Sequence, residues 1–398
     1  MFLSSSCKSD HKSNSIKVDE VPELLDRNEK IQLGKEWDYV QNFYSDQYQI
    51  LQADPQDGEA KLNLAELFIK EARVTGEHGH YYPAALKMTN EILTSKGVDS
   101  TIQYQALVSK AGVQLSLHEF QKALVTAESA IRINSSNAQI HGVMVDCLVE
   151  LGRYDEAIKE ADKMNSLKPD IRSYSRIAYL REINGDVDGA IQALRLAIKS
   201  GYPGNEETAW AMQTLGDLYV LYDDLDKAEK IYNEILEMRE NYPFAVGGLG
   251  EIAFQKGNLK EAEEKIHEAI AIIPEVGFYG QLAHIYKERS QKERLAETIE
   301  EIFLMLEDDV KAGHNMNLEY ADIYLDLLDD VDKATLYIKE EFEKRPLNID
   351  VNRKYAKILL ADKKYDEAKV CASRASVTNS AHPELREILA ALTSMLNK

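Results

Sequence analysis

The stretch LGRYDEAIKEADKMNSLKP, residues 151–169, has the pattern of a tight turn followed by one short amphipathic helix. Gly152 suits the turn because glycine adopts left-handed backbone angles without a steric penalty. Ala157 and Ala161 lie one helical turn apart, so they place two small side chains on the same face of the helix. Pro169 ends the helix, because proline cannot continue the backbone hydrogen bonding. The stretch therefore predicts a helix suited to close packing against a neighbour.

Small residues in the same context recur along most of the chain, with a period of about 34 residues that is typical of stacked helical repeats. They are Ala85, Ala123, Ala157, Ala190, Ala228, Ala262, Ala296, Ala334 and Ala368. A turn-like segment such as GDVDGA or GNLKEA precedes most of them, and a second helical pattern such as LGDLY at 215–219 precedes that turn. The period predicts nine helical hairpins. A single hairpin cannot bury its apolar face alone, so we expect the hairpins to stack into an array.

This pattern resembles the tetratricopeptide repeat over roughly residues 59–382. The motif is well kept in AMQTLGDLYVLYDDLDKAEKIYNEIL, residues 211–236, and in VGGLGEIAFQKGNLKEAEEKIHEAIAIIP, residues 246–274. The unit that ends in Ala296 departs from it, because SQKERLAETIEEI lacks the usual glycine turn. The resemblance implies an all-α fold, a right-handed superhelical α-solenoid of about nine hairpins.

The chain as a whole is also similar to a set of bacterial tetratricopeptide proteins. The similar segments are IKEARVTGEHGHYYPAAL, YSRIAYLREINGDVDGAIQALRLAI and EEFEKRPLNIDVNRKYAKILL. For that set the resemblance implies a binding or assembly role, and no enzymatic activity follows from it.

The two ends of the chain are expected to differ from the array. We assign residues 1–29 to a disordered tether, because the segment KSDHKSNSIKVDE is polar and has no periodicity. Residues 30–382 are expected to form the solenoid, beginning with a helix near 30–52. Residues 383–398 are expected to form a helix that caps the open end of the array.

Cys7 has two interpretations. The opening MFLSSSC resembles the end of a bacterial lipoprotein signal, in which a cysteine follows small residues and becomes lipidated. Lipidation of Cys7 would anchor the array to the bacterial cell envelope, on the periplasmic or outer-membrane side. The alternative is a surface cysteine on a cytoplasmic protein, because the basic and apolar regions of a signal are missing from the sequence.

The charge and the motif content exclude several classes of function. The chain has 68 acidic and 47 basic residues, a formal net charge of −21, which argues against nucleic acid and anionic lipid surfaces as partners. No apolar run of about 18 residues could span a membrane. Cys147 and Cys371 are expected to be buried thiols. Motifs for nucleophilic, phosphate-binding or metalloprotease chemistry are absent, so we expect no enzyme, no cofactor and no small-molecule substrate.

Two histidines, His78 and His80, lie in the segment EHGHYY, within an excess of residues in the first unit. Histidines at this spacing beside Glu77 could contribute to a metal site. Because no third ligand is visible at a suitable spacing, we interpret the segment as a polar loop and assign no metal. The segments DDLD at 223–226 and DDVD at 329–332 are interpreted as helix caps rather than calcium loops.

Arg172 and Arg176 lie one helical turn apart on the first helix of their unit. In some tetratricopeptide co-chaperones, basic residues at these two places help to bind the terminal carboxylate of a peptide. Those proteins also need Lys and Asn in the two preceding units, where this chain has Val108, Gly112 and Val143. We interpret Arg172 and Arg176 as candidate peptide-binding residues on the concave face. The alternative is that both form intramolecular salt bridges.

The sequence thus favours a non-enzymatic scaffold that binds a peptide or partner protein in the concave groove. Two alternatives remain open: a metal-dependent or hydrolytic enzyme with a site near His78 and His80, and a structural protein that assembles with itself.

Overall fold

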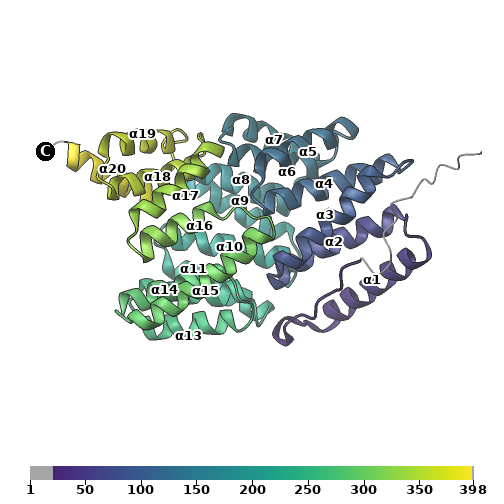
Figure 1. Ribbon diagram of the computed structural model, residues 1–398, viewed down its shortest axis with the longest axis horizontal. Helices are drawn as coiled ribbons and strands as arrows, with labels where there is room; N and C mark the ends of the chain where they lie inside the picture. Colours follow the sequence, from purple (N-terminus) through teal and green to yellow (C-terminus); the bar gives the residue numbers. More distant parts are fainter. Residues whose placement is uncertain (1–20, 397–398) are drawn as a thin grey trace, which may run out of the picture.

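The computed structural model describes residues 21–396, so Cys7 and the predicted tether up to residue 20 lie outside the described residues. Within this range the chain forms nine helical hairpins between helix α1 (Gly34–Ala53) and helix α20 (Pro383–Leu396) (Figure 1). The first helices of the hairpins are α2 (Gly58–Thr75), α4 (Ser100–Ser116), α6 (Ala138–Glu150), α8 (Ile171–Ile183), α10 (Glu206–Leu221), α12 (Pro243–Gln255), α14 (Val276–Glu288), α16 (Asn317–Asp322) with its π-helical continuation η3 (Ile323–Leu327), and α18 (Ile349–Ala361). The second helices are α3 (His78–Thr94), α5 (Phe120–Ile133), α7 (Tyr154–Leu167), α9 (Val187–Ser200), α11 (Leu225–Met238), α13 (Leu259–Ile270), α15 (Lys292–Lys311), α17 (Val331–Lys344) and α19 (Tyr365–Ala375). The predicted all-α solenoid is confirmed.

Every hairpin within residues 21–396 turns at one residue with left-handed backbone angles. These residues are Gly76, His118, Gly152, Gly185, Asp223, Gly257, Ser290, Asp329 and Lys363, with φ between 53° and 81°. Glycine adopts this conformation freely, whereas other residues do so at a cost of about 1 kcal/mol. Ser290, with φ of 56°, replaces glycine in the unit that departs from the motif. That unit therefore keeps the same turn without its glycine.

The recurrent alanines lie in the tightest parts of the array. Eight of the nine are completely buried, as expected for small residues that let two helices approach closely. Ala296 is exposed, so the predicted alignment is wrong in this unit. In α5 to α19 the buried alanine is the fourth residue of the second helix, and in α15 this place belongs to Leu295. The repeat after Ala262 is thus slightly shorter than the sequence alignment assumed. The predicted packing residue is therefore one position too far along the helix.

Both ends of the array are covered by additional helices. Helix α1 packs on α2 and buries Trp37 and Val40. Ahead of α1, the guanidinium of Arg27 is buried and donates two hydrogen bonds of 2.7 Å to the carboxylate of Glu71. Packing against the array therefore begins before residue 30. At the other end, α20 packs on α18 and α19 and buries Ile388 in their apolar cluster. Among the described residues, no helix has both the length and the hydropathy needed to cross a bilayer.

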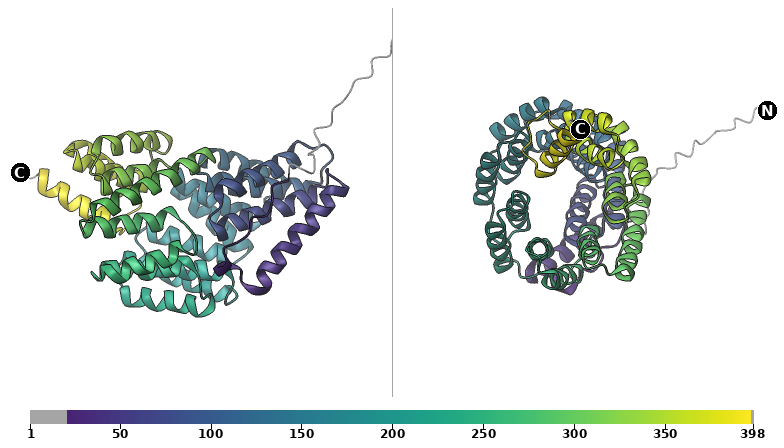
Figure 2. Two further views of the ribbon diagram at one scale, coloured as in Figure 1. Left: turned by 60° about the horizontal axis from the view of Figure 1, so that its bottom comes forward. Right: turned by 90° about the vertical axis from the view of Figure 1, so that its left-hand side faces the viewer.

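The array winds into a superhelix whose second turn lies against its first (Figure 2). Hydrogen bonds connect residues that are 195 to 198 positions apart in the sequence. They run from His118 Nδ1 to the carbonyl of Asn315 (2.8 Å), from Asn348 Nδ2 to the carbonyl of Glu150 (3.1 Å), and from the backbone N–H of Ile349 to the hydroxyl of Tyr154 (2.8 Å). We call this contact between successive turns the seam.

A buried cation lies at the centre of the seam. The guanidinium of Arg345 pairs with Glu150 of the first turn and with Glu341 of its own helix. Its carbon also lies 4.6 Å from the centre of the Phe120 ring, which is again on the first turn. Burial raises the pKa of Glu150, and the charge of Arg345 opposes that rise. Since removing one partner of a buried ion pair leaves an uncompensated charge, Arg345 makes the two turns depend on each other.

Gly152 allows a direct test of the seam. A Cβ atom on Gly152 would lie 2.4 Å from the carbonyl oxygen of Leu347 on the second turn. Gly257 has nearly the same φ, 77° against 74°, and its Cβ would meet nothing within 4 Å. We expect Gly152→Ala to lower the free energy of unfolding by about 1–3 kcal/mol more than Gly257→Ala, because only the first change forces the turns apart. Chemical denaturation measures the difference, and equal losses in the two variants would contradict the seam.

Candidate functional site

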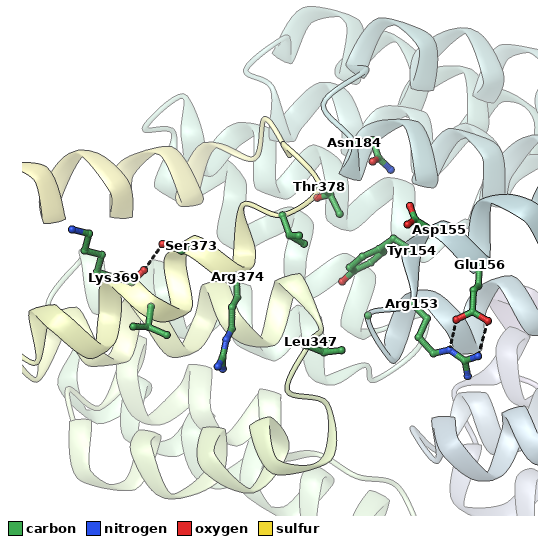
Figure 3. A pocket seen from close by; sticks show the side chains of 13 residues that line it. Arg153, Tyr154, Asp155, Glu156, Asn184, Leu347, Lys369, Ser373, Arg374 and Thr378 are labelled. Atoms are coloured by element: carbon green, nitrogen blue, oxygen red, sulfur yellow. Dashed lines mark hydrogen bonds and ion pairs between the residues drawn. The ribbon is translucent and has the colours of Figure 1, made fainter.

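A cavity of about 890 Å³ opens at the seam, between the start of α7 and helix α19 (Figure 3). On one side it is lined by Gly152 and the first residues of α7, and on the other by Leu347 and residues of α19. Its lining thus comes mainly from the third and the ninth hairpins of the described array, with Asn184 from the fourth. We call this cavity the seam groove.

Three exposed apolar side chains line the seam groove. Leu347, Val370 and Val377 are 58%, 53% and 65% exposed, although the array has ample core in which such side chains could be buried. Exposed apolar side chains that gather in one concave place commonly mark a binding surface. The groove therefore offers an apolar contact area rather than a catalytic constellation.

The charges around the groove differ on its two sides. On α7, Arg153 is held by a bidentate ion pair with Glu156, at 2.8 and 2.7 Å, so its charge is compensated. On α19, Lys369 makes no ion pair with any described residue. Arg374 lies over the ring of Phe342, 5.5 Å from its centre, and has no carboxylate partner within residues 21–396. The α19 side is therefore locally positive on an acidic protein.

One of the seam hydrogen bonds ties a residue of the groove lining to the second turn. The hydroxyl of Tyr154, which lines the groove, accepts the hydrogen bond from the backbone N–H of Ile349. Burial raises the pKa of Tyr154, so the hydroxyl stays protonated. A groove whose residues are already held in place loses little conformational entropy when it binds a ligand.

The two arginines predicted to bind peptide lie on α8 and make intramolecular ion pairs. Arg176 forms a bidentate pair with Asp146 on α6, at 2.8 and 2.6 Å, and donates to the carbonyl of Gly142. Burial alone would lower the pKa of Arg176, but the Asp146 carboxylate outweighs it and raises the pKa. Arg172 pairs with Glu207 on α10 at 2.5 Å. A role in peptide binding stays a prediction for both residues.

Similar ion pairs link other first helices of the array. Lys354 and Lys357 on α18 pair with Asp322 of α16 and Asp326 of η3, and Arg353 pairs with Glu384 of α20 at 2.8 Å. Each of these pairs joins one unit to its neighbour. Most of the cations on these helices are therefore already compensated by carboxylates of the chain itself.

The segment with His78 and His80 is not the polar loop that the sequence suggested. Both residues belong to the first turn of α3, because the excess residues lengthen this helix instead of forming a loop. His80 points to the carbonyl of Glu23, 2.8 Å away. His78 instead lies near Asp309 and His314, which belong to the second superhelical turn. A set of residues that could hold a metal is therefore present, although the sequence showed no third ligand.

Three family models for the tetratricopeptide repeat match residues 114–182, 170–241 and 214–275. The hairpins of the structure continue the same pattern on both sides of the matched region. The chain is a tetratricopeptide repeat protein. No curated protein sequence matches it significantly.

Several solved structures are similar to this one. The human IFIT1 dimer with PPP-AAAA has a TM-score of 0.51 at 14% identity, over 80% of this chain and 72% of that one. The APC/C hetero-tetramer Cut9–Hcn1 has a TM-score of 0.47 at 14% identity, over 91% of this chain and 61% of that one. The pilF protein of Pseudomonas aeruginosa has a TM-score of 0.42 at 14% identity, over 58% of this chain and 96% of that one. At such low identity the likeness concerns the fold alone.

Other sequence predictions for the tetratricopeptide array concern its packing. Cys147 and Cys371 are free and buried, as predicted, and burial raises the pKa of both thiols. Four tyrosines of the array are also buried in its core, namely Tyr219, Tyr232, Tyr286 and Tyr355. Of the two aspartate segments, Asp330 caps α17 by accepting from the N–H of Lys333 at 3.1 Å. These residues serve the array and leave the seam groove as the main candidate site.

Proposed function

We propose that the protein is a non-enzymatic scaffold that binds an extended peptide segment of a partner protein in the seam groove. The observation that carries this proposal is the cavity of about 890 Å³ with its exposed apolar lining. Tetratricopeptide arrays present side chains from several stacked units to one partner, which suits an extended ligand. The groove combines side chains from two superhelical turns, so it forms only where these turns lie against each other.

The charges of the groove indicate the chemistry of the peptide. Val370 and Val377 favour apolar side chains on the ligand, because the contact removes apolar surface from water. Lys369 and Arg374 favour an acidic residue beside them, since neither has a carboxylate partner among the described residues. The proposed ligand is therefore an apolar segment followed or preceded by Asp or Glu.

A random peptide library displayed on phage tests this proposal. We expect selection on the purified protein to enrich apolar sequences with an acidic residue, and Val370→Asp to weaken binding of the selected peptides at least about tenfold, because a buried apolar contact is lost and a negative charge repels the acidic residue. Fluorescence anisotropy measures the affinities.

Val125→Asp is the matched control for this experiment. Val125 lies two residues after the repeat alanine Ala123 of α5, as Val370 lies two residues after Ala368 of α19, and the two valines are 54% and 53% exposed. The control should bind the peptides like the wild type. Peptides that bind both variants equally well would refute the groove, and association of the protein with itself in sedimentation would favour a structural role instead.

Arg172 and Arg176 are proposed as a second contact, for a terminal carboxylate of the partner. Arg172 lines a separate cavity of about 480 Å³ between the ends of neighbouring hairpins. Its ion pair with Glu207 is exposed, with 52% and 47% of the two side chains accessible, so the pair contributes little and a ligand carboxylate could replace Glu207. Arg176, held by Asp146, would supply a fixed positive charge one turn away.

Peptides with a free terminal carboxylate and their amidated forms distinguish this contact from the groove. We expect the free forms to bind about threefold or more tightly to the wild type, and the difference to vanish in the Arg172→Glu/Arg176→Glu variant, because the carboxylate loses its charged partners. Arg181→Glu, on the same helix, is the control and should retain the difference. If the double variant still distinguishes the two forms, the assignment of the arginines is wrong.

Attachment to a bacterial envelope through Cys7 is a separate part of the proposal, supported by the sequence MFLSSSC. We expect wild-type protein expressed in bacteria to incorporate a labelled fatty acid, and Cys7→Ala to incorporate none, since the thiol is the only attachment point proposed. Autoradiography or click detection on the purified protein measures the label. A wild type without label would favour the cytoplasmic alternative.

A further inference from the structure

Two second helices of the described array are longer than the others, and they meet at the seam. Helix α3 has 17 residues and α15 has 20, whereas the remaining second helices have 11 to 14. Helices α3 and α15 lie on successive turns and contact each other directly. The sequence departs from the repeat pattern in both places, with extra residues near His78 and with the long helix that follows Ser290. Both departures from the repeat pattern thus lie where α3 and α15 contact each other.

Three side chains with metal-binding atoms gather at this point. His78 comes from the first turn of α3, Asp309 from the last turn of α15, and His314 from the loop that follows α15. One ring nitrogen of each histidine and one carboxylate oxygen of Asp309 lie within 4.8 Å of one another. Tetrahedral Zn²⁺ with bonds of about 2.0–2.1 Å holds its ligand atoms about 3.3 Å apart, so a modest movement of the side chains would bring three of the four ligands into place, and a water molecule would supply the fourth.

The rings of both histidines are held in position by their neighbours. The ring of His78 stacks on Tyr82 with a centroid distance of 5.1 Å, and that of His314 lies 5.7 Å from the same tyrosine. His314 Nδ1 donates to the backbone carbonyl of Asp309 at 3.2 Å. Such outer contacts orient metal-binding histidines and limit the entropy lost on binding.

Two members of this cluster, the ring of His78 and the carboxylate of Asp309, make no hydrogen bond to a described residue. Neither ring nitrogen of His78 makes a hydrogen bond to a described residue, and no Lys or Arg within residues 21–396 pairs with the Asp309 carboxylate. The ring of His78 and the Asp309 carboxylate therefore have lone pairs that are free to bind a cation.

We propose that His78, Asp309 and His314 form a zinc site that fastens the first superhelical turn to the second. Two imidazoles and one carboxylate suit Zn²⁺ better than Ca²⁺ or Mg²⁺, which prefer oxygen ligands. The positive ion would offset the half-buried negative charge of Asp309 and give the ring of His78 a partner. Because the ligands are about 230 residues apart in the sequence, binding would stabilise the seam and with it the base of the seam groove.

Zinc titration of the full chain, stripped with a chelator, tests the site. We expect the wild type to bind one equivalent of Zn²⁺ by elemental analysis and by titration with a zinc-sensitive dye, with a rise in its unfolding temperature. Amide exchange should slow at residues 75–80 and 312–316 when ZnCl₂ is added, because both segments become tied together. Substitution of His78 or His314 by Ala should weaken zinc binding at least about tenfold.

His80→Ala is the matched control, since His80 lies two residues from His78 on the same helix and outside the cluster. It should keep the zinc affinity of the wild type. Asp309→Asn, which preserves the size of the side chain, gives a second test if an alanine variant folds poorly by circular dichroism. Absence of stoichiometric zinc at micromolar concentration, or zinc binding that all three ligand variants retain, would overturn the proposal.

Discussion

The ion pair of Arg345 with Glu150 is the interaction on which the shape of the array depends. In a tetratricopeptide array each hairpin packs mainly on its neighbours, so the pitch of the superhelix is set by small rotations that accumulate from unit to unit. Here the buried guanidinium of Arg345 reaches a carboxylate 195 positions earlier. A charge buried at this place requires its partner, so the second turn is tied to one position on the first.

The seam has consequences for binding. The seam groove exists only because α19 is brought beside α7, and Tyr154 both lines the groove and accepts the hydrogen bond of Ile349. An isolated solenoid bends easily, and a peptide that ordered it would lose affinity to the conformational entropy of the array. A seam that is already closed before the peptide binds reduces this loss of conformational entropy. The cluster of His78, Asp309 and His314 lies at the same contact between the two turns. A metal bound there would therefore also hold the two turns together.

Much of the fold could be predicted from the sequence, because each unit contains its own signals. Gly152 and Ala157 perform the predicted roles of turn and packing residue, and both predictions rest on local backbone sterics. The prediction failed where a local signal was ambiguous. Ala296 was taken for a packing residue because the regular repeat spacing points to it, yet Leu295 occupies the place. His78 and His80 were read as a loop because the excess residues could not be assigned to a longer helix by pattern alone.

The sequence by itself determined the class of fold, the number of hairpins and the position of nearly every turn, because these depend on interactions within one repeat or between adjacent repeats. Only the tertiary structure decided which residues share a site. Tyr154 and Glu150 each have a partner 195 positions away, and the partners of His78 are further still, so their approach depends on the summed rotation of many hairpins. No short-range pattern records that sum. The solenoid fold can therefore be predicted from signals within each repeat. The seam groove and the histidine cluster, in contrast, form only when a complete superhelical turn brings distant repeats together.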